Sequence, residues 1–295
     1  MAGAISYPPI PLFEVGPFTL SMHGLMAGVG FVLGAWVMLR LVKRRGFNDA
    51  AVTSALTWAL VGAIVGARLF TIPAHLGDPG YGIDDVVDPA GFYSIMGGFA
   101  GGIIAGLVRL RMLKLRFLPQ LDLAAFGLAV GTIVGRTGDL FIVEHLGGET
   151  DFFLGYTLKP GYDIAPQHGA LERLCDVEGI CGTFHHAALY DLLGAAVLLG
   201  VLVWLARKWR GWHYGQLFAV WAGWYGVQRF LIDFTRNDNF VDFPAGVAPN
   251  VDATLGPLTW SQWSGLAVVA GAVALFVVLG RRAKRVTPEH DVEMG

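Results

Sequence analysis

Long apolar runs alternate with short polar segments along almost the whole chain. A helix needs about 20 apolar residues to cross a bilayer, and seven runs reach or approach this length. They predict spans at residues 19–41, 50–72, 91–112, 119–141, 184–206, 213–235 and 258–280. The pattern predicts an all-α integral membrane protein with seven transmembrane helices, residues 1–295 forming a single polytopic membrane domain. Only 15% of the residues are charged, whereas a soluble domain carries about 25%.

Basic residues gather at every second boundary between spans. The four clusters are Arg40/Lys43/Arg44/Arg45, Arg109/Arg111/Lys114/Arg116, Arg207/Lys208/Arg210 and Arg281/Arg282/Lys284/Arg285. With seven spans all four lie on one side, which the positive-inside rule makes cytoplasmic. The N-terminus is therefore expected outside and the C-terminus in the cytoplasm. No outward basic patch with interleaved aromatic residues is present in the sequence, so nucleic acid is not an expected partner.

The stretch 145–183 is too long for a tight turn and is rich in Gly, Pro and acids, which predicts a small extracytoplasmic head. Its two cysteines, Cys175 and Cys181, are expected to form a disulfide on this oxidising side. Metal ligation by the two thiols is the weaker alternative, and no metal or cofactor is predicted. Residues 286–295 form a polar C-terminal tail.

Arginines inside apolar segments are the best indication of function. Inserting one costs about 2.5–3.5 kcal/mol, so such residues face a cavity, pair with an acid or hold an anion. Arg68, Arg136 and Arg229 each lie near the outer end of an outward-running span. They predict an anion-holding cavity open to the outer half of the membrane, with a phospholipid phosphate as the obvious anion. Arg236 ends its span, where snorkelling to lipid headgroups is the favoured interpretation.

Two of these arginines have acids at helical spacing. Arg136 and Asp139 stand three residues apart, and Arg229 and Asp233 stand four apart, so each pair can meet on one helix face. Arg68 has no acid at either spacing, so a residue of another helix or a ligand is expected to serve it.

The same residues carry a family resemblance. The stretch Gly135-Arg136-Thr137-Gly138-Asp139-Leu140-Phe141-Ile142-Val143-Glu144, followed by Gly147, resembles the GRxGNFxNxE signature of the prolipoprotein diacylglyceryl transferases. Shorter matches extend the resemblance over nearly the whole chain. They are Gly16-Pro17 to Gly24-Leu25-Met26, Gly66-Ala67-Arg68, Met96-Gly97-Gly98 (the family's HGG), His185 to Leu189-Tyr190-Asp191 (its HPSQLYE), and Tyr225-Gly226 through Arg229, Asp233 and Arg236.

Several positions depart from the family pattern. Asp139 and Ile142 replace the two signature asparagines, Met96 replaces the histidine of HGG, and His23 stands where the family usually has tyrosine. Asp191 and Asp233 shorten what are usually glutamates. The anion-holding arginines thus match, while groups nearest the presumed chemistry have changed.

The resemblance implies transfer of a diacylglyceryl group from phosphatidylglycerol to the lipobox cysteine thiol of preprolipoproteins, releasing glycerol 1-phosphate. It implies a multi-pass protein of a prokaryotic cytoplasmic (inner) membrane, with membrane lipids around it. Fixed cations must stabilise the departing phosphate, a role expected of Arg136 and Arg229 with Arg68 in support. A base must take the thiol proton, and His23, Glu144 and Asp139 are the candidates.

Further substrate contacts are expected from Gly97, Gly98, Gly147, Tyr190, Tyr225 and Arg236. For Gly97 and Gly98, close helix packing is the simpler explanation. For the two tyrosines, packing and interfacial anchoring are equally good explanations. A catalytically silent or repurposed relative that binds anionic phospholipid or a lipoprotein precursor is the alternative function. A transporter is disfavoured because the inner halves of the spans are apolar.

Overall fold

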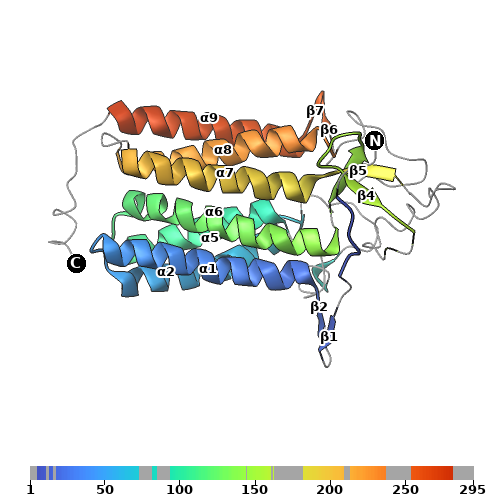
Figure 1. Cartoon of the computed structure of the whole chain (residues 1–295). Helices are drawn as coiled ribbons and strands as arrows, with labels where there is room; N and C mark the ends of the chain where they lie inside the picture. Colours follow the sequence, from blue (N-terminus) through green and yellow to red (C-terminus); the bar gives the residue numbers. More distant parts are fainter. Residues whose placement is uncertain are drawn as a thin grey trace. The chain divides into compact units, whose positions relative to one another are not determined.

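The computed structural model describes residues 5–10, 13–15, 18–72, 82–84, 94–143, 145–160, 162, 182–208, 213–236 and 254–281. These residues are mostly helical. Their long helices are α1 (Met22–Arg44), α2 (Asp49–Leu69), α5 (Ile95–Met112), α6 (Phe117–Ile142), α7 (Ala187–Lys208), α8 (Gln216–Asp233) and α9 (Trp260–Arg281) (Figure 1). Each of these helices overlaps one of the apolar runs in the sequence. Glu144, Cys175, Cys181, the side chain of Met96 and the tail 286–295 lie outside the described residues.

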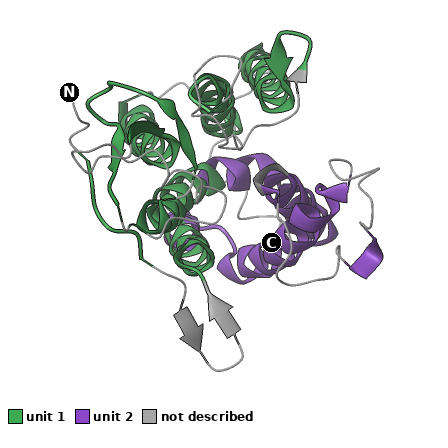
Figure 2. Ribbon diagram, turned by 90° about the vertical axis from the view of Figure 1, so that its right-hand side faces the viewer, with its two compact units in different colours: residues 1–37, 124–284 green, residues 38–123, 285–295 purple. Residues whose placement is uncertain are grey.

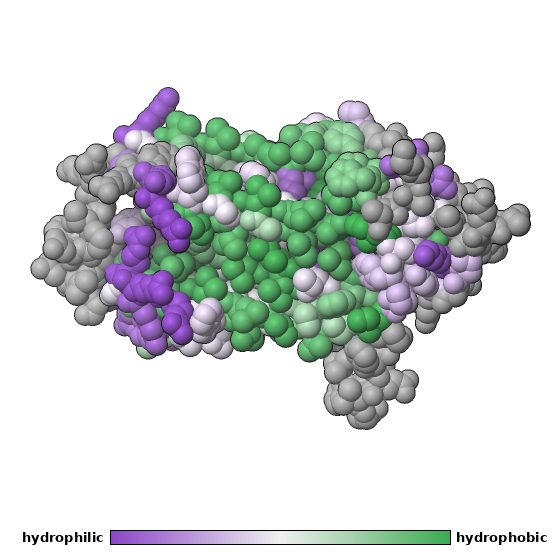
Figure 3. Space-filling model, in the orientation of Figure 1, coloured by the Kyte–Doolittle hydropathy of each residue, from purple (hydrophilic) through white to green (hydrophobic). Residues whose placement is uncertain are grey.

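Five helices in the described part of the chain are long and apolar enough to cross a membrane: α1, α2, α6, α7 and α9. Their outward faces carry exposed apolar side chains, for example Val32, Val61, Val197 and Val273, each more than half exposed. Figure 3 shows apolar residues covering the helices, with hydrophilic residues gathered towards helix ends. Apolar surface on this scale is typical of contact with lipid rather than water, so the chain is a multi-pass membrane protein.

The chain divides into two compact units, residues 1–37 with 124–284 and residues 38–123 with 285–295 (Figure 2). In the second unit, α2 packs on α5 through facing glycines. A Cβ on Gly66 would overlap the carbonyl oxygen of Gly97, and one on Gly101 would overlap that of Gly62. The small-residue spacing around Gly97 therefore serves close helix packing. Asn48 and Ser94 cap the two helices by accepting from the backbone N–H of Ala51 and Gly97.

The first unit holds α7, α8, α9, most of α1 and α6, and a small antiparallel sheet. Strands β3 (Leu146–Glu149), β4 (Tyr156–Leu158) and β5 (Gly182–His186) follow the order β3-β5-β4. Two short hairpins join β1 (Phe13–Val15) to β2 (Phe18–Leu20) and β6 (Thr254–Leu255) to β7 (Leu258–Thr259). Buried residues of the three strands and of the turn after α6 form one core, which consists of Val143, Leu146, Tyr156, Leu158 and Phe184.

The sheet changes one predicted boundary. The fifth apolar run was expected to be helical from residue 184, but Phe184 to His186 belong to β5 and the helix begins at Ala187. Phe184 pairs with Tyr156 of β4, and His186 pairs with Leu146 of β3. This strand pairing uses the backbone groups that a helix would need, so the helix starts only where the pairing ends.

Candidate functional site

Arg136 and Asp139 lie in the last two turns of α6 and form the ion pair that their spacing predicts. Nη1 of Arg136 donates to Oδ2 of Asp139 at 2.6 Å, and the Asp139 side chain is only 1% exposed. The guanidinium is largely buried too. A charge at this depth is tolerated because its partner is held close by.

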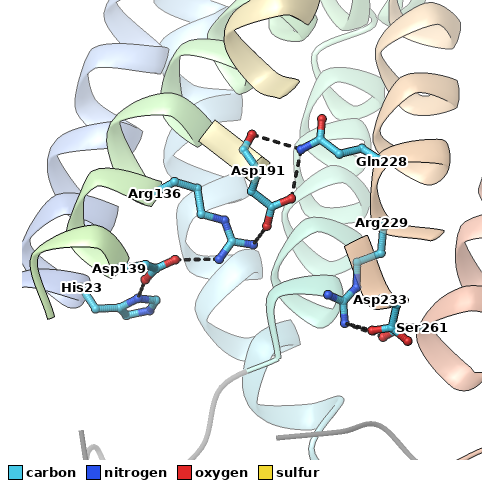
Figure 4. A network of polar contacts seen from close by, with 8 residues as sticks. All are labelled: His23, Arg136, Asp139, Asp191, Gln228, Arg229, Asp233 and Ser261. Atoms are coloured by element: carbon cyan, nitrogen blue, oxygen red, sulfur yellow. Dashed lines mark hydrogen bonds and ion pairs between the residues drawn. The ribbon is translucent and has the colours of Figure 1, made fainter. Parts of the chain in front are cut away.

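A second acid binds the same guanidinium from another helix. Nη2 of Arg136 lies 2.7 Å from Oδ2 of Asp191, in the second turn of α7. Gln228 of α8 in turn donates to Oδ1 of Asp191 at 2.9 Å and to its backbone carbonyl at 3.0 Å. Trp224 donates to the amide oxygen of Gln228. The two carboxylates thus fix Arg136 between α6 and α7, and α8 supports the arrangement (Figure 4).

His23 extends the chain of contacts to α1. Its Nδ1 contacts Oδ1 of Asp139 (Figure 4). Ser21 caps α1 by accepting from the backbone N–H of Gly24, which places His23 in the first turn. A Cβ on Gly138 would overlap Met22 and His23, so the two helices approach closely here only because residue 138 is glycine. Asp139 therefore contacts the histidine with one oxygen and the arginine with the other.

Arg229 is held at the junction of α8 and α9. Its Nη2 donates to Oγ of Ser261 at 2.6 Å and lies 3.6 Å from Oδ1 of Asp233, the pair expected from spacing. A capping box begins α9: Thr259 Oγ1 accepts from the N–H of Gln262, and Gln262 Oε1 accepts from the N–H of Thr259. The Thr259 hydroxyl also donates to Asp233. These bonds fix Ser261 in the first turn, where it can accept from Arg229.

Tyr225 lies within electrostatic range of both arginines. It lies on α8 one turn before Arg229 and interacts electrostatically with Arg136, Asp191 and Arg229. Both arginines of the predicted pair are therefore within electrostatic range of one phenol. The polar residues come from the ends of α6 and α8 and from the starts of α1, α7 and α9. They consequently share one end of this unit, as their similar depth in the sequence predicts.

The segment after α6 has an unusual backbone. Val143 and His145, on either side of Glu144 in sequence, have φ values of 54° and 64°. Non-glycine residues rarely adopt this left-handed conformation, and a β-branched valine there is strained. His145 interacts with Arg236, Asp139, Arg136 and His23, and burial lowers its pKa to about 3. It is therefore neutral beside the arginines.

Gly147 and Tyr190 lie beside this network, in contacts within the protein. A Cβ on Gly147 would overlap the carbonyl oxygen of Thr235, which accepts from the N–H of Gly148 at 2.9 Å. The hydroxyl of Tyr190 hydrogen-bonds to Nδ1 of His185 at 3.1 Å, and its ring meets Phe152 edge to face. These contacts give both residues a packing role in the first unit.

Arg68, Gly97 and Gly98 belong to the second unit. Arg68 is buried in the last turn of α2, and its carbonyl oxygen accepts from the Thr71 hydroxyl at 2.7 Å. Gly97 packs against α2, and Gly98 lies close to Ala63 and Ala67. Within the described ranges, no group of His, Cys, Asp and Glu residues has the composition of a metal site.

Sequence reasoning did not select Gln228 or Ser261 as site residues. Gln228 is an uncharged polar residue inside an apolar helix, directly before Arg229, and that position was an available signal. Ser261 lies in a Thr-Trp-Ser-Gln stretch whose capping-box spacing predicts a helix start. Its contact with Arg229 could not be read from the sequence, because it depends on how α8 and α9 pack.

These features define a class: an integral membrane protein with a buried network of arginines and carboxylates at one end of its helices. The family model described as prolipoprotein diacylglyceryl transferase matches residues 10–278. The chain belongs to this family.

Relatives named phosphatidylglycerol–prolipoprotein diacylglyceryl transferase support the assignment. The protein of Thermosynechococcus vestitus is 30% identical over 91% of this chain and 92% of its own length. That of Frankia alni is 28% identical over 99% of this chain and 72% of its own. That of Leifsonia xyli is 27% identical over 95% and 84%, respectively.

Proposed function

We propose that this protein transfers a diacylglyceryl group from phosphatidylglycerol to the lipobox cysteine thiol of preprolipoproteins and releases glycerol 1-phosphate. The observation that carries the proposal is that Arg136 and Arg229, from different helices, are each fixed by carboxylates at the same end of the first unit. Two fixed guanidinium groups at one end of the unit are suited to a phosphate diester whose negative charge grows during the reaction. Family membership supplies the reaction class.

The carboxylates around Arg136 orient it for this role. A guanidinium carries five N–H donors, and the pairs with Asp139 and Asp191 engage one donor on each Nη atom. The other N–H groups of Arg136 can therefore bind a phosphate oxygen while both carboxylate pairs remain in place. Arg229, held by Ser261 and Asp233, is the second phosphate contact in this proposal, and Tyr225 donates from between them.

The remaining substrate contacts follow from the same reasoning. Arg68, Gly97 and Gly98 are proposed to contact the lipid, and Arg236 to contact its headgroup or neighbouring membrane lipids. Tyr190 and Gly147 act by shaping the wall of the site, as their packing contacts indicate. The proton of the attacking thiol goes to a base for which His23, Asp139 and Glu144 are the candidates.

The proposed topology has seven spans, with the N-terminus outside and the C-terminus in the cytoplasm of a prokaryotic cell. In support, Lys or Arg residues occupy the last turn of α1, α5, α7 and α9, and neither type is present in the first turn of these helices. The site then faces the extracytoplasmic side, where lipoprotein precursors emerge. Single cysteines introduced at Lys208 and Asp151, in a background where Cys175 and Cys181 are replaced by serine, test this topology, because an impermeant thiol reagent should label only the second in intact cells.

A silent relative that binds anionic phospholipid is the second candidate function. It is favoured by the two carboxylates that already neutralise Arg136, and by Met96 and Ile142 in place of the family's polar residues. Purified protein in phosphatidylglycerol vesicles separates the two functions. With a lipobox peptide, we expect peptide modification and glycerol 1-phosphate release, both lost in Arg136→Ala. Lipid binding without modification by the wild type would overturn the transferase proposal.

A further inference from the structure

One carboxylate joins a histidine to the central arginine of the site. Oδ1 of Asp139 contacts Nδ1 of His23, and Oδ2 accepts from Nη1 of Arg136 at 2.6 Å (Figure 4). The Asp139 side chain is 1% exposed, whereas that of His23 is 42% exposed. A buried anion shared by two cationic partners couples them, because a stronger interaction with one weakens its interaction with the other.

The contact also fixes the chemistry of the imidazole ring. An aspartate beside Nδ1 favours the tautomer with its proton on that atom, which places the lone pair on Nε2. A neutral histidine in this arrangement can accept a proton through that lone pair. Its exposure allows a substrate thiol to approach, and the cap at Ser21 together with Gly138 holds the ring in place.

Resting on the transferase function proposed above, we propose that His23 takes the proton of the substrate thiol and that Asp139 transmits the new charge to Arg136. When His23 becomes an imidazolium, Asp139 interacts more strongly with it and compensates less of the guanidinium charge. Arg136 is then a stronger electrostatic partner for the phosphate as that phosphate leaves. His23 is the catalytic base in this scheme, and Asp139 is a positioning residue.

The step balances as a substitution at carbon. The thiol proton moves to Nε2 of His23, and the sulfur electron pair forms a bond to the terminal glycerol carbon of the diacylglyceryl group. The bond from that carbon to the phosphate oxygen breaks, and its electron pair stays on the oxygen. The phosphate charge thereby changes from minus one to minus two, and the imidazolium later releases its proton to water. Stabilisation that grows with this charge lowers the barrier rather than only strengthening binding.

A proton on His23 sets the net charge of the polar network. The polar network that His23 joins contains Arg136 and Asp139 of α6, Asp191 of α7, Arg229 and Asp233 of α8, Arg236 just beyond α8, and His145 just beyond α6. Of these, Asp139 contacts His23 (Figure 4) and His145 interacts with it. The three guanidinium groups and three carboxylates compensate one another, and His145 is neutral. Among these described groups, a proton on His23 therefore turns a neutral network into a positive one.

Turnover as a function of pH tests the base and its coupling. For the wild type in phosphatidylglycerol vesicles, kcat should fall as the pH is lowered through the range in which histidine titrates. His23→Gln should lose about 10²–10⁴-fold in kcat, the usual contribution of a general base, together with this low-pH limb. Asp139→Asn should move the limb to lower pH and reduce the plateau at least about 10-fold. The variant with both substitutions should be no slower than His23→Gln. If the two fold losses in kcat instead multiply, the coupling is overturned.

Thr132→Val is the matched control, because Thr132 lies one turn before Arg136 on α6 and its hydroxyl donates only to the Leu128 carbonyl among the contacts described. Its profile should match the wild type. If the wild type is active and His23→Gln has the same kcat and pH profile, the base assignment is overturned while the transferase function remains intact.

Lipid binding provides a readout that does not depend on turnover. Binding of phosphatidylglycerol relative to phosphatidylcholine in mixed vesicles should strengthen for the wild type as the pH falls and His23 takes up its proton. In His23→Gln this pH dependence should disappear, and in Asp139→Asn it should move to lower pH. If the wild type is inactive but its phosphatidylglycerol binding still depends on pH, only the transferase function is overturned. If its binding does not change with pH, the coupling is overturned.

Discussion

Arg136 of α6 and Asp191 of α7 form an ion pair with 2.7 Å between Nη2 and Oδ2. Together with the pair to Asp139 on the other Nη atom, it fixes the plane of the guanidinium. Only arginine can serve two carboxylates and a phosphate from one rigid group, since the lysine ammonium is a point charge on a flexible stem.

Arg136→Lys is therefore expected to lose about 10²–10³-fold in kcat, as when a fixed donor to a developing anion is removed, although the charge is retained. The measurement is diacylglyceryl transfer to a fluorescent lipobox peptide. Arg109→Lys is the control, because Arg109 bonds Ser54 and stacks over Trp58 at the basic end of α5. A lysine variant at 136 with wild-type turnover would show that orientation of the guanidinium is unimportant.

The second arginine depends on a hydroxyl group. Ser261→Ala removes the 2.6 Å acceptor of Arg229 and leaves Asp233 at 3.6 Å as its described partner in α8. A hydrogen bond to a charged group contributes about 1.5–3 kcal/mol, so we expect kcat/KM to fall about 10-fold or more. Ser261→Thr keeps the hydroxyl and should retain most of the activity. Equal losses in both variants would point to packing rather than to the hydrogen bond.

The positions of the helices and the charged pairs within them were predictable from sequence. The length of the apolar runs predicted the long helices. The sequence spacing of charged residues predicted the pairs of Arg136 with Asp139 and of Arg229 with Asp233. Both depend on residues near in sequence, where helix geometry fixes distance.

Contacts between helices were not predictable in this way. Sequence left His23 as one of three possible bases and gave no partner for it, because its meeting with Asp139 depends on the close approach of α1 and α6 at Gly138. The pairing of Arg136 with Asp191 likewise depends on how α6 and α7 pack. The strand before α7 was missed for the same reason, since Phe184 pairs with residues more than 25 positions earlier in the chain.

Gly147 tests whether a signature glycine serves packing. A methyl group there would overlap the backbone of Thr235, which cannot yield like a flexible side chain. Overpacking costs about 1–3 kcal/mol, so Gly147→Ala should lower the Tm in detergent by several degrees. A methyl group on Gly200 of α7 would meet open space, and Gly200→Ala should leave Tm unchanged or slightly raised. If Gly147→Ala instead kept the wild-type Tm and lost only turnover, a direct substrate contact would be indicated.

His186 makes the sheet sensitive to acid. Tyr7 donates its hydroxyl proton to the Leu140 carbonyl at 2.6 Å, so at 3.0 Å it accepts from Nε2–H of His186. Nδ1 of His186 is buried and has no hydrogen-bond partner among the described residues. A proton there would place a charge in an apolar setting, and burial lowers the pKa of His186 to about 4.

The sign of the effect follows from the two pKa values. The unfolded chain takes up this proton near pH 6.5, before the native state does, so stability is full above that pH and falls as the pH approaches 4. The loss is on the order of 2–3 kcal/mol. His186→Gln keeps a donor for Tyr7 and has no proton to gain, so its Tm should fall less than that of the wild type between pH 7 and pH 4.5. Other groups titrate equally in both proteins, and the difference between the two curves therefore isolates His186. Parallel curves would mean that this histidine is protonated in the native protein at no cost.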